Sequence, residues 1–394
     1  MAEADDIEVS IVMPCLNEAE TLLGCIREAQ NAIRASGIAG EVVIADNGST
    51  DGSPRIAEEA GARVVHVEDK GYGSALMGGI KAARGKFVLM GDADGSYVFG
   101  ELPAFLARLR AGDQLVMGCR LPSGGGRIES GAMPWKHRWI GNPVLSGLGK
   151  LFFHAPVSDF HCGLRAFDRR AILDLDLRCT GMEFASEMVV KSVVARLKFA
   201  QVPITLRPDG RSRPPHLRSW SDGWRHLRFM LLYSPKWLFF IPGTILFLGG
   251  LIGFIALMFG PIRIGNVSFD TNTLLVCATA LLIGFQAIFF AVYTKTFAVL
   301  TGLLRPDPRI TRLLKAQPVE WGVGIGLMLL VFGLGYLVFA VIRWKDVGFG
   351  NLSYSDSLRI VIPGVTAMAL GAQSIFSGFA LAVLGLARNI RRKE

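Results

Sequence analysis

The stretch EVSIVMPCLNE at residues 8–18 sets the pattern from which the fold is predicted. Its apolar, β-branched run predicts a strand, and the run opens into Pro14 and the polar pair Asn17-Glu18. The pattern recurs in EVVIADNGSTDG at 41–52 and in KFVLMGDADGS at 86–96. Strands that each end in a polar loop predict a ligand site at the carboxyl edge of a sheet.

Segments with helical periodicity separate these runs and two further ones. Strands are predicted at 8–13, 41–45, 63–67, 87–90 and 114–118, and helices at 18–33, 54–60, 73–83 and 101–109. Regular alternation of strand and helix predicts an α/β fold, with a mostly parallel sheet covered by helices on both faces.

The pair Asp92 and Asp94 flanks a small residue directly after the fourth strand. Two carboxylates so placed can converge on one hard cation, Mg²⁺ or Mn²⁺, that also bridges to substrate phosphates. The alternative for an isolated DxD is an Asp-rich turn. Neither GxxxxGK[ST] nor a GxGxxG after the first strand is present, which argues against P-loop kinases and nicotinamide dehydrogenases. The segment 71–74 is either a phosphate-binding helix start or a plain loop.

The second half of the chain has the composition of a membrane protein. Hydrophobic residues make up 51% of the chain, charged residues only 19%, and the mean hydropathy is +0.39. Residues 1–235 carry 28 Lys and Arg against 27 Asp and Glu, whereas residues 236–394 carry 14 against 6. The excess positive charge therefore flanks apolar runs and does not indicate a nucleic-acid partner. Uncharged runs long enough to span a bilayer lie at 237–262, 271–294, 321–342 and 360–387.

The segments between these runs predict the orientation. Basic residues gather in 295–320 and after 387, while the other two connections hold few. By the positive-inside rule, both termini and the first domain lie in the cytoplasm. The start MAEADDIEVS lacks the apolar h-region of a signal peptide. We therefore expect a multi-pass protein of the cell (inner) membrane with a cytoplasmic first domain.

A basic amphipathic segment joins the two halves. Within 218–236, apolar residues recur at helical spacing between basic ones: Trp220, Trp224, Leu227, Met230 and Leu231. This pattern predicts a helix in the membrane interface, the alternative being a surface helix packed on the first domain. The predicted parts are a domain at 1–217, an interface helix at 218–236 and a transmembrane domain at 237–394.

Small residues within the apolar runs predict close helix contacts. They are Gly249, Gly250, Gly253, Gly322, Gly324 and Gly326. Such contacts suit packing within one chain or between copies in a homo-oligomer, and the sequence does not choose. The six cysteines form no CxxC pair, so neither a zinc site nor a disulfide framework is indicated.

Five motifs in order resemble those of family 2 glycosyltransferases. PCLNE at 14–18, DNGSTDG at 46–52 and DAD at 92–94 resemble the signature elements of the family. DFHCGLR at 159–165 and DGRSR at 209–213 are similar to later motifs of the polyprenyl-phosphate hexose synthases, the dolichol-phosphate mannose and glucose synthase group. The resemblance covers residues 8–235. It implies a GT-A-type nucleotide-binding domain, followed in some members by an all-α membrane domain of four helices.

The resemblance also implies roles for individual residues. A GDP- or UDP-hexose donor would be bound by Pro14, Glu18, Asp46, Asp92 and Arg120. Asp92 and Asp94 would hold the metal ion and, with Arg165 on a phosphate, act in catalysis. Arg211 and Arg213 would hold the acceptor phosphate. Asp159 lies near the expected site and would orient an arginine or the sugar, or else cap the next turn. Asn47 departs from many members, and Ser96 stands where some relatives have a metal-facing Gln.

The activity that this resemblance implies is the inverting transfer of one hexose from a nucleotide sugar to a polyprenyl phosphate. A lipid phosphate is already an anion at neutral pH, so it needs positioning by arginines more than deprotonation. A divalent ion would neutralise the leaving diphosphate. One alternative is a processive polysaccharide synthase, although the QxxRW motif of that group is absent from the sequence. Another is a lipid-linked-sugar transporter with a vestigial nucleotide-binding module. His161 and His216 are expected to be structural.

Overall fold

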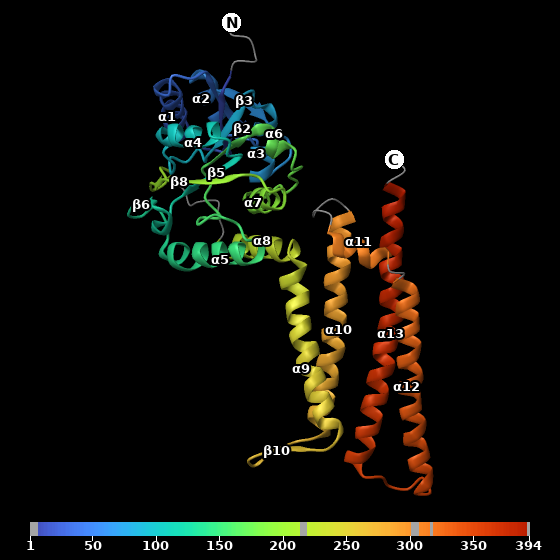
Figure 1. Cartoon of the computed structure of the whole chain (residues 1–394). Helices are drawn as coiled ribbons and strands as arrows, with labels where there is room; N and C mark the ends of the chain where they lie inside the picture. Colours follow the sequence, from blue (N-terminus) through green and yellow to red (C-terminus); the bar gives the residue numbers. More distant parts are fainter. Residues whose placement is uncertain (1–6, 213–218, 301–306, 316–317, 392–394) are drawn as a thin grey trace. The chain divides into compact units, whose positions relative to one another are not determined.

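The computed structural model describes residues 7–212, 219–300, 307–315 and 318–391 (Figure 1). The chain divides into two compact units, Met1–Tyr233 and Ser234–Glu394. The first is built on a sheet and the second on long helices.

The first unit contains a seven-stranded sheet in the order β3-β2-β1-β4-β7-β5-β8. The strands are β1 (Val9–Cys15), β2 (Gly40–Asp46), β3 (Arg63–His66), β4 (Phe87–Met90), β5 (Leu115–Cys119), β7 (Arg165–Asp168) and β8 (Phe199–Pro203). All neighbours pair in parallel except β7, which is antiparallel to both β4 and β5. The mostly parallel sheet is as predicted. The sequence pattern misses β7 because the run RAFD has a charge at each end and no apolar periodicity.

The helices of this unit are α1 (Leu22–Ala35), α2 (Ser53–Glu59), α3 (Tyr72–Ala82), α4 (Leu102–Arg110), α5 (Asn142–Phe153), α6 (Arg169–Leu173), α7 (Phe184–Val194) and α8 (Ser219–Leu232). A short parallel pair joins β6 (Arg127–Ile128) to β9 (Thr205–Leu206). Helix α1 begins at Leu22, later than predicted. Asn17 has a φ of 58°, and the N–H groups of Thr21 and Leu22 both bond to the carbonyl of Glu18. Residues 16–21 therefore form a turn that holds Glu18 beside the strand end.

Helices cover both faces of the sheet, as predicted. Alternate side chains of β1 enter different cores: Ile11 and Met13 pack with α1 and α4, and Val12 packs with α3 and α7. Six of the seven β1 positions are buried, and Pro14 is half-buried. A central parallel strand buried on both faces is expected to read as a continuous apolar run.

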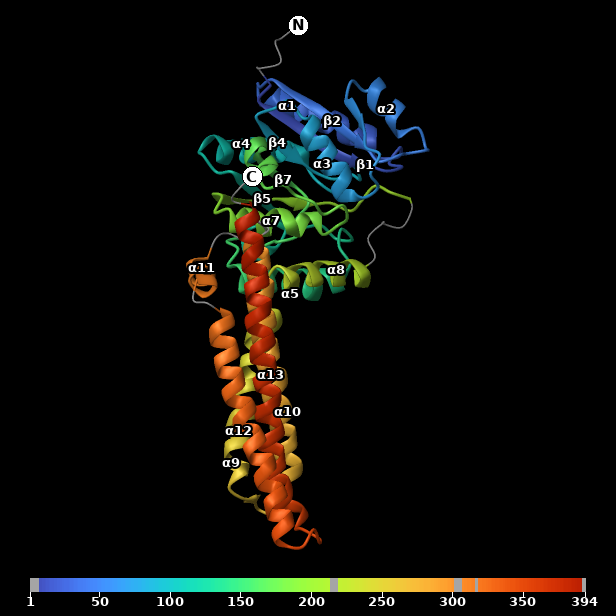
Figure 2. The ribbon, with the colours of Figure 1, turned by 90° about the vertical axis from the view of Figure 1, so that its right-hand side faces the viewer.

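Helix α8 packs against α5 and α7, and Figures 1 and 2 show α5 and α8 side by side. Met230 is fully buried and Phe229 nearly so, whereas Trp224 and Leu232 are more than half exposed. The helix thus presents one apolar face to the unit and leaves other apolar side chains uncovered. Met230, predicted on the lipid-facing stripe, belongs instead to the core.

The second unit contains, among the described residues, four helices long and apolar enough to cross a membrane. They run over Lys236–Met258, Thr271–Leu300, Pro318–Asp346 and Tyr354–Gly385. The first comprises η4 (Lys236–Phe240) and α9 (Ile241–Met258), and the others lie in α10 (Thr271–Leu300), α12 (Pro318–Asp346) and α13 (Tyr354–Arg391). A hairpin of β10 (Ile262–Ile264) and β11 (Val267–Phe269) joins α9 to α10, and α11 (Pro308–Lys315) precedes α12. The first span therefore ends at Met258, before the predicted limit of 262.

Glycines bring α12 and α13 into close contact. A Cβ atom on Gly326 would lie 2.6 Å from the carbonyl oxygen of Gly371, and a Cβ on Gly371 would lie equally close to that of Gly326. Gly322 approaches Gly378 in the same way. Gly324, predicted to share this role, has no atom within 4 Å of an added Cβ. The contact therefore follows one helix face, as small residues permit in membrane helices.

Gly326→Leu should destabilise the second unit, because its side chain meets Ile375 and the backbone of Gly371. Overpacking of this kind costs about 1–3 kcal/mol. Thermal unfolding of the detergent-solubilised protein, followed by tryptophan fluorescence, measures the effect. Gly324→Leu on the same helix is the matched control and should unfold like the wild type. Equal midpoints for the two variants would contradict this packing.

Candidate active site at the carboxyl edge of the sheet

Polar residues after β1, β2 and β4 meet at one edge of the sheet because these strands are adjacent and parallel. Cys15 is in register with Asp46, and Val12 with Met90. A cavity of about 580 Å³ opens at this edge. We call it the first cavity. Five predicted site residues line it: Pro14, Glu18, Asp92, Asp94 and Arg211.

Asp46 is not among the residues that line the first cavity. It ends β2 and is only 3% exposed. Its carboxylate accepts hydrogen bonds from the backbone N–H groups of Gly48 (3.1 Å) and Ser49 (3.2 Å). The residues next to it, Asn47 and Gly48, do line the cavity. Asp46 therefore shapes the turn that borders the cavity.

The side chain of Asn47 ties this turn to the segment before α3. Its amide nitrogen donates to the carbonyls of Val67 (3.0 Å) and Asp69 (2.8 Å), and its amide oxygen accepts from the N–H of Gly71 (2.7 Å). The N–H groups of Gly73 and Ser74 both bond to the carbonyl of Thr180. Residues 72–74 open α3, so the helix start is confirmed, but these two donors are engaged within the protein, which argues against a phosphate-binding role for them.

Asp92 and Asp94 lie on the wall of the first cavity beyond the buried end of β4. Tyr72 donates its hydroxyl to Asp92 Oδ1 (3.0 Å), and the backbone N–H and hydroxyl of Ser96 donate to Asp94 Oδ1 (3.0 and 2.6 Å). Burial first, and then the charge of Asp94, raise the pKa of Asp92 to about 7. Two carboxylates held this close disfavour full ionisation unless a cation compensates them.

The two carboxylates fit a hard divalent cation, because carboxylate oxygens are the ligands that Mg²⁺ and Mn²⁺ prefer. Within the described ranges, no group of three or more His, Cys, Asp or Glu side chains could hold a metal ion. Such a cation would therefore share its coordination with water or substrate phosphate, as Mg²⁺ commonly does. Ser96, which stands where some relatives have a metal-facing Gln, donates its hydroxyl hydrogen to Asp94.

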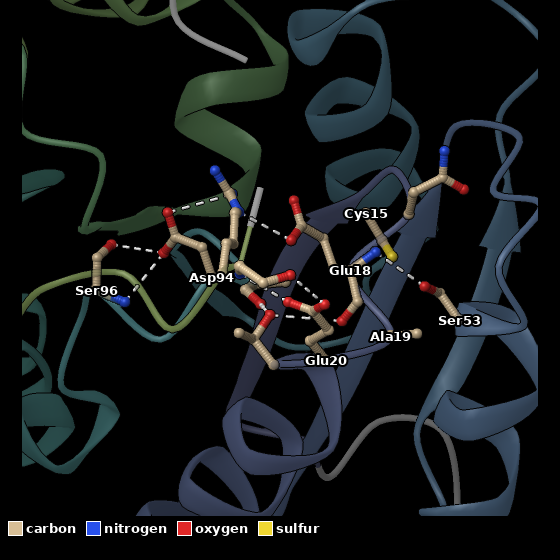
Figure 3. Close-up of polar contacts among 12 residues, drawn as sticks. Cys15, Glu18, Ala19, Glu20, Ser53, Asp94 and Ser96 are labelled. Atoms are coloured by element: carbon tan, nitrogen blue, oxygen red, sulfur yellow. Dashed lines mark hydrogen bonds and ion pairs between the residues drawn. The ribbon is translucent and has the colours of Figure 1, made fainter. Parts of the chain in front are cut away.

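A strap formed by residues 207–212 crosses this edge of the sheet. The N–H of Gly210 bonds to the carbonyl of Asp94, and Ser212 bonds to Glu20. Arg211 Nε donates to Glu18 Oε2 (2.9 Å), and its Nη2 lies 3.2 Å from Asp94 Oδ2. Figure 3 shows how Glu18, Glu20 and Asp94 converge here. Arg211, a predicted acceptor residue, thus lines the first cavity and faces Asp94, a predicted metal ligand. Arg213 lies outside the described residues.

A second cavity, of about 230 Å³, adjoins the first. Tyr72, Asp92 and Met182 line both. The remaining wall of the second cavity comes partly from α5, with Asn142 and Leu145, and partly from α8, with Gly223 and His226. Asp92 therefore stands at the junction of two chambers.

Arg120 lines the second cavity and forms a buried ion pair with Asp159. Its Nε and Nη2 donate to the two oxygens of Asp159 at 2.7 and 2.9 Å, and its backbone N–H adds a third bond. Burial alone would raise the pKa of Asp159, but the Arg120 guanidinium outweighs it and the pKa is lowered. The structure thus brings two predicted site residues together, with Asp159 fully buried behind Arg120.

Arg165 lines neither cavity and is fully buried. Its guanidinium donates to the carbonyls of Phe160, Cys162 and Ala185. Burial lowers its pKa. These bonds fasten the 160–165 segment to α7. Because all three guanidinium nitrogens of Arg165 already donate to carbonyls, the side chain is poorly placed to bind a phosphate.

Three aromatic side chains that line the site were not among the predicted site residues. Tyr72 touches both cavities, Tyr97 accepts the N–H of Gly163 on its hydroxyl (2.8 Å), and His161 lines the second cavity. The only signal for Tyr72 is its place after Gly71 at a helix start. Tyr97 and His161 reach the site through chain crossings that a linear pattern does not show.

Comparisons with known proteins agree with this geometry. Residues 10–175 match the glycosyl transferase family 2, and residues 292–385 match the glycosyltransferase family 2 C-terminal transmembrane region. The low-salt glycan biosynthesis hexosyltransferase Agl6 of Haloferax volcanii is 37% identical over 379 residues, which are 96% of this chain and 89% of that protein. The dolichyl-phosphate hexose transferase of the same organism is 30% identical over 208 residues, 52% of this chain and 86% of that protein.

Glucosyl-3-phosphoglycerate synthase of Mycobacterium tuberculosis, solved with Mn²⁺, UDP and glucosyl-3-phosphoglycerate, has a TM-score of 0.46 and 25% identity over 58% of this chain and 80% of that one. At this level of likeness, its ligands remain properties of that enzyme. The Agl6 match extends over nearly the whole chain. The chain belongs to glycosyltransferase family 2: it is a glycosyltransferase of the GT-A fold class with a helical membrane domain.

Asp159→Ala should lower the free energy of unfolding by roughly 3–5 kcal/mol, because it leaves the buried Arg120 unpaired. Since folding lowers the pKa of Asp159, the stabilisation is present at neutral pH and is lost as the pH falls through the folded-state pKa. Chemical denaturation followed by fluorescence measures it.

Glu59→Ala is the matched control for Asp159→Ala. It breaks the exposed Arg55–Glu59 pair, and surface pairs contribute little to stability. If Asp159→Ala unfolded with the same midpoint as this control, the buried pair would make no measurable contribution to the free energy of unfolding.

Proposed function

We propose that this protein transfers a single hexose, with inversion, from a GDP- or UDP-hexose to a polyprenyl phosphate at the cytoplasmic face of the membrane. The observation that carries the proposal is the junction at Asp92, where two chambers of different character meet. One chamber ends at a carboxylate pair faced by an arginine. The other is bounded by two helices with exposed apolar side chains.

The first cavity is the proposed donor site. Pro14 and Glu18 border it, and Asn47 and Gly48 form the turn at its far side. Asp46 holds this turn from behind, so we assign it an indirect role in binding the nucleotide. A nucleotide sugar whose diphosphate lies at Asp92 and Asp94 has the anomeric carbon of its hexose near the junction of the two cavities. When bound, the divalent ion neutralises the charge that develops on the leaving diphosphate.

Arg120 and Arg211 are the proposed phosphate-facing cations, since each lines a cavity that Asp92 also lines. Asp159 fixes the plane of the Arg120 guanidinium and acts on substrate only through it. Arg165, with its donors taken by three carbonyls, holds the second cavity in shape. We therefore assign Asp159 and Arg165 positioning roles in the reaction.

The acceptor is proposed to reach the site from the side of α5 and α8. Val144 on α5, Trp224 on α8 and Trp139 in the turn just before α5 are each more than half exposed. Arg138 stacks over Trp139. Exposed aromatic side chains beside basic ones are typical of a surface that meets anionic lipid headgroups. The phosphate of a lipid held there has only to be positioned, because it is already an anion and needs no general base.

Relatives and sequence support the same choice of acceptor. One relative is named as a dolichyl-phosphate hexose transferase, and the chain itself carries four apolar helices within the described part. The basic connections between the apolar runs favour a cytoplasmic site. Activity without a lipid phosphate, by elongation of a polysaccharide, would favour a processive synthase instead.

The direct test incubates purified full-length protein with Mn²⁺, a long-chain polyprenyl phosphate and labelled nucleotide sugars, and counts label in the organic phase. We expect label from one donor, abolished by EDTA.

Asp94→Asn should lose at least about 100-fold in rate in the same assay, since it removes a charge that would hold the cation, and its unfolding midpoint should be unchanged. Near-normal turnover of this variant at saturating Mn²⁺ would contradict the metal assignment. No label from any donor would overturn the proposed reaction.

Arg211→Ala should raise the apparent KM for the nucleotide sugar far more than the KM for lipid phosphate, because Arg211 lines the proposed donor cavity beside Asp94. Loss of a charge-assisted hydrogen bond costs roughly 1.5–3 kcal/mol, which is about 10- to 150-fold in KM. Initial rates with each substrate varied in turn measure the two constants. Arg207→Ala, on the same strap but paired with Glu28, is the control. A larger change in the acceptor KM would assign Arg211 to the acceptor phosphate instead.

A further inference from the structure

A short β-ribbon, formed by β10 and β11, connects the first two membrane-spanning helices. Its strands pair antiparallel around the two-residue turn Gly265-Asn266. Gly265 has a φ of 58°, which suits the first central position of a type II′ turn. Helix α9 ends at Met258 and α10 begins at Thr271, and Figure 1 shows the ribbon extending sideways from the ends of these helices. The ribbon is therefore held at the level where two spans leave the membrane.

The register of the two strands gives the ribbon one apolar face and one polar face. Successive side chains along a strand alternate between faces, and residues directly opposite each other in an antiparallel pair share a face. The apolar face therefore carries four side chains: Ile262, Ile264, Val267 and Phe269. The polar face carries the pair Arg263 and Ser268. All six residues are exposed, and an exposed apolar face of this kind calls for a partner.

The base of the ribbon is fixed to α13. Asp270 follows β11 directly, accepts the N–H of Thr271 (2.7 Å) and forms an ion pair with Arg359. The hydroxyl of Ser355 lies 3.4 Å from each oxygen of Asp270. These contacts bring the start of α13 beside the start of α10, so the connection between α12 and α13 lies at the same end of the unit. Exposed aromatic side chains, typical of a membrane–water boundary, mark this connection and its flanks: Trp344, Phe349 and Tyr354.

The backbone of the ribbon limits how deep in a membrane it can lie. The sheet has only two strands, so the outer edge of each strand carries N–H and C=O groups that have no partner in the ladder. Hydrocarbon does not satisfy such groups, which excludes the bilayer core. In water, an isolated two-stranded hairpin is only marginally stable, and the four apolar side chains are disfavoured there. The headgroup region meets both requirements, because water reaches the backbone while acyl chains cover one face.

We propose that the ribbon of β10 and β11 lies flat in the bilayer surface, with its apolar face against the acyl chains. Its partner is the lipid of the leaflet in which α9 ends, which is the non-cytoplasmic leaflet in the orientation proposed for the chain. Arg263, on the opposite face, then lies at the level of the lipid phosphates, where a cation is stabilised. Because Asp270 ties the ribbon to α10 and α13, lipid binding by the ribbon opposes movement of these helices along the membrane normal.

The test measures depth with nitroxide labels on the full chain in nanodiscs of phosphatidylcholine and phosphatidylglycerol. Val267→Cys and its matched control Ser268→Cys place the label on opposite faces of the ribbon, at positions that are both exposed. Collisions with oxygen, which concentrates in hydrocarbon, are compared with collisions with a water-soluble nickel chelate. The label at 267 should lie about 5–10 Å into the headgroup–acyl boundary, as amphipathic helices do, and the label at 268 should remain open to the chelate. Wild-type protein treated with the same reagent measures the background from Cys179 and Cys277, which are partly exposed.

Equal access of the nickel chelate to both labels would place the ribbon in water and overturn the proposal. A label at 267 that neither reagent reaches would overturn it as well, because a protein surface such as a second copy of the chain would then cover the apolar face.

A second pair of variants needs no label. Ile264→Asp should lower the thermal unfolding midpoint in nanodiscs, because it moves a charge into the acyl region, and Ser268→Asp should not lower it. Equal midpoints for the two variants would contradict the lipid contact. These measurements use neither nucleotide nor polyprenyl phosphate, so their outcome is independent of the proposed reaction.

Discussion

Asp92 and Asp94 follow β4, a strand buried on both faces, and their negative charges therefore meet where water stabilises them poorly. Several surrounding side chains stabilise this negative charge. Tyr72 and Ser96 donate hydroxyl hydrogens to the pair, and Arg211 reaches it from a strap more than a hundred residues away in the chain. A site held in this way can exchange one counter-charge for another, as the proposed binding of a diphosphate with its cation requires.

The sheet supplies the precision of this arrangement. Because β1, β2 and β4 are parallel neighbours, their carboxyl ends deliver Pro14, Asn47 and Asp92 to one edge without any direct contact between them. The antiparallel β7 then separates β4 from β5 and places the 160–165 segment beside Asp92. The buried ion pair between Arg120 and Asp159 ties the start of that segment to the end of β5, because breaking it would leave a charge away from water.

Local patterns account for the predicted elements that are found. Apolar runs gave β1 to β5 nearly to the residue, and uncharged runs gave the four long helices, because both depend on which side chains avoid water. The same reasoning failed for β7, whose charged ends hide it, and for Met230, whose apolar character fits a protein core as well as a lipid surface. It also took Gly324 and Gly326 as equivalent, although only Gly326 faces α13.

For the site, the sequence by itself determined which residue types stand at the strand ends: the carboxylates of Asp92 and Asp94, and arginines in the later motifs. Only the tertiary structure decided what each one does there. It turned Asp46 toward its own turn, enclosed Arg165 among carbonyls and set His161 on a cavity wall although its sequence context suggests a structural histidine. The physical reason is that burial and hydrogen-bond partners come from segments distant in the chain, whereas a motif records only neighbours along it.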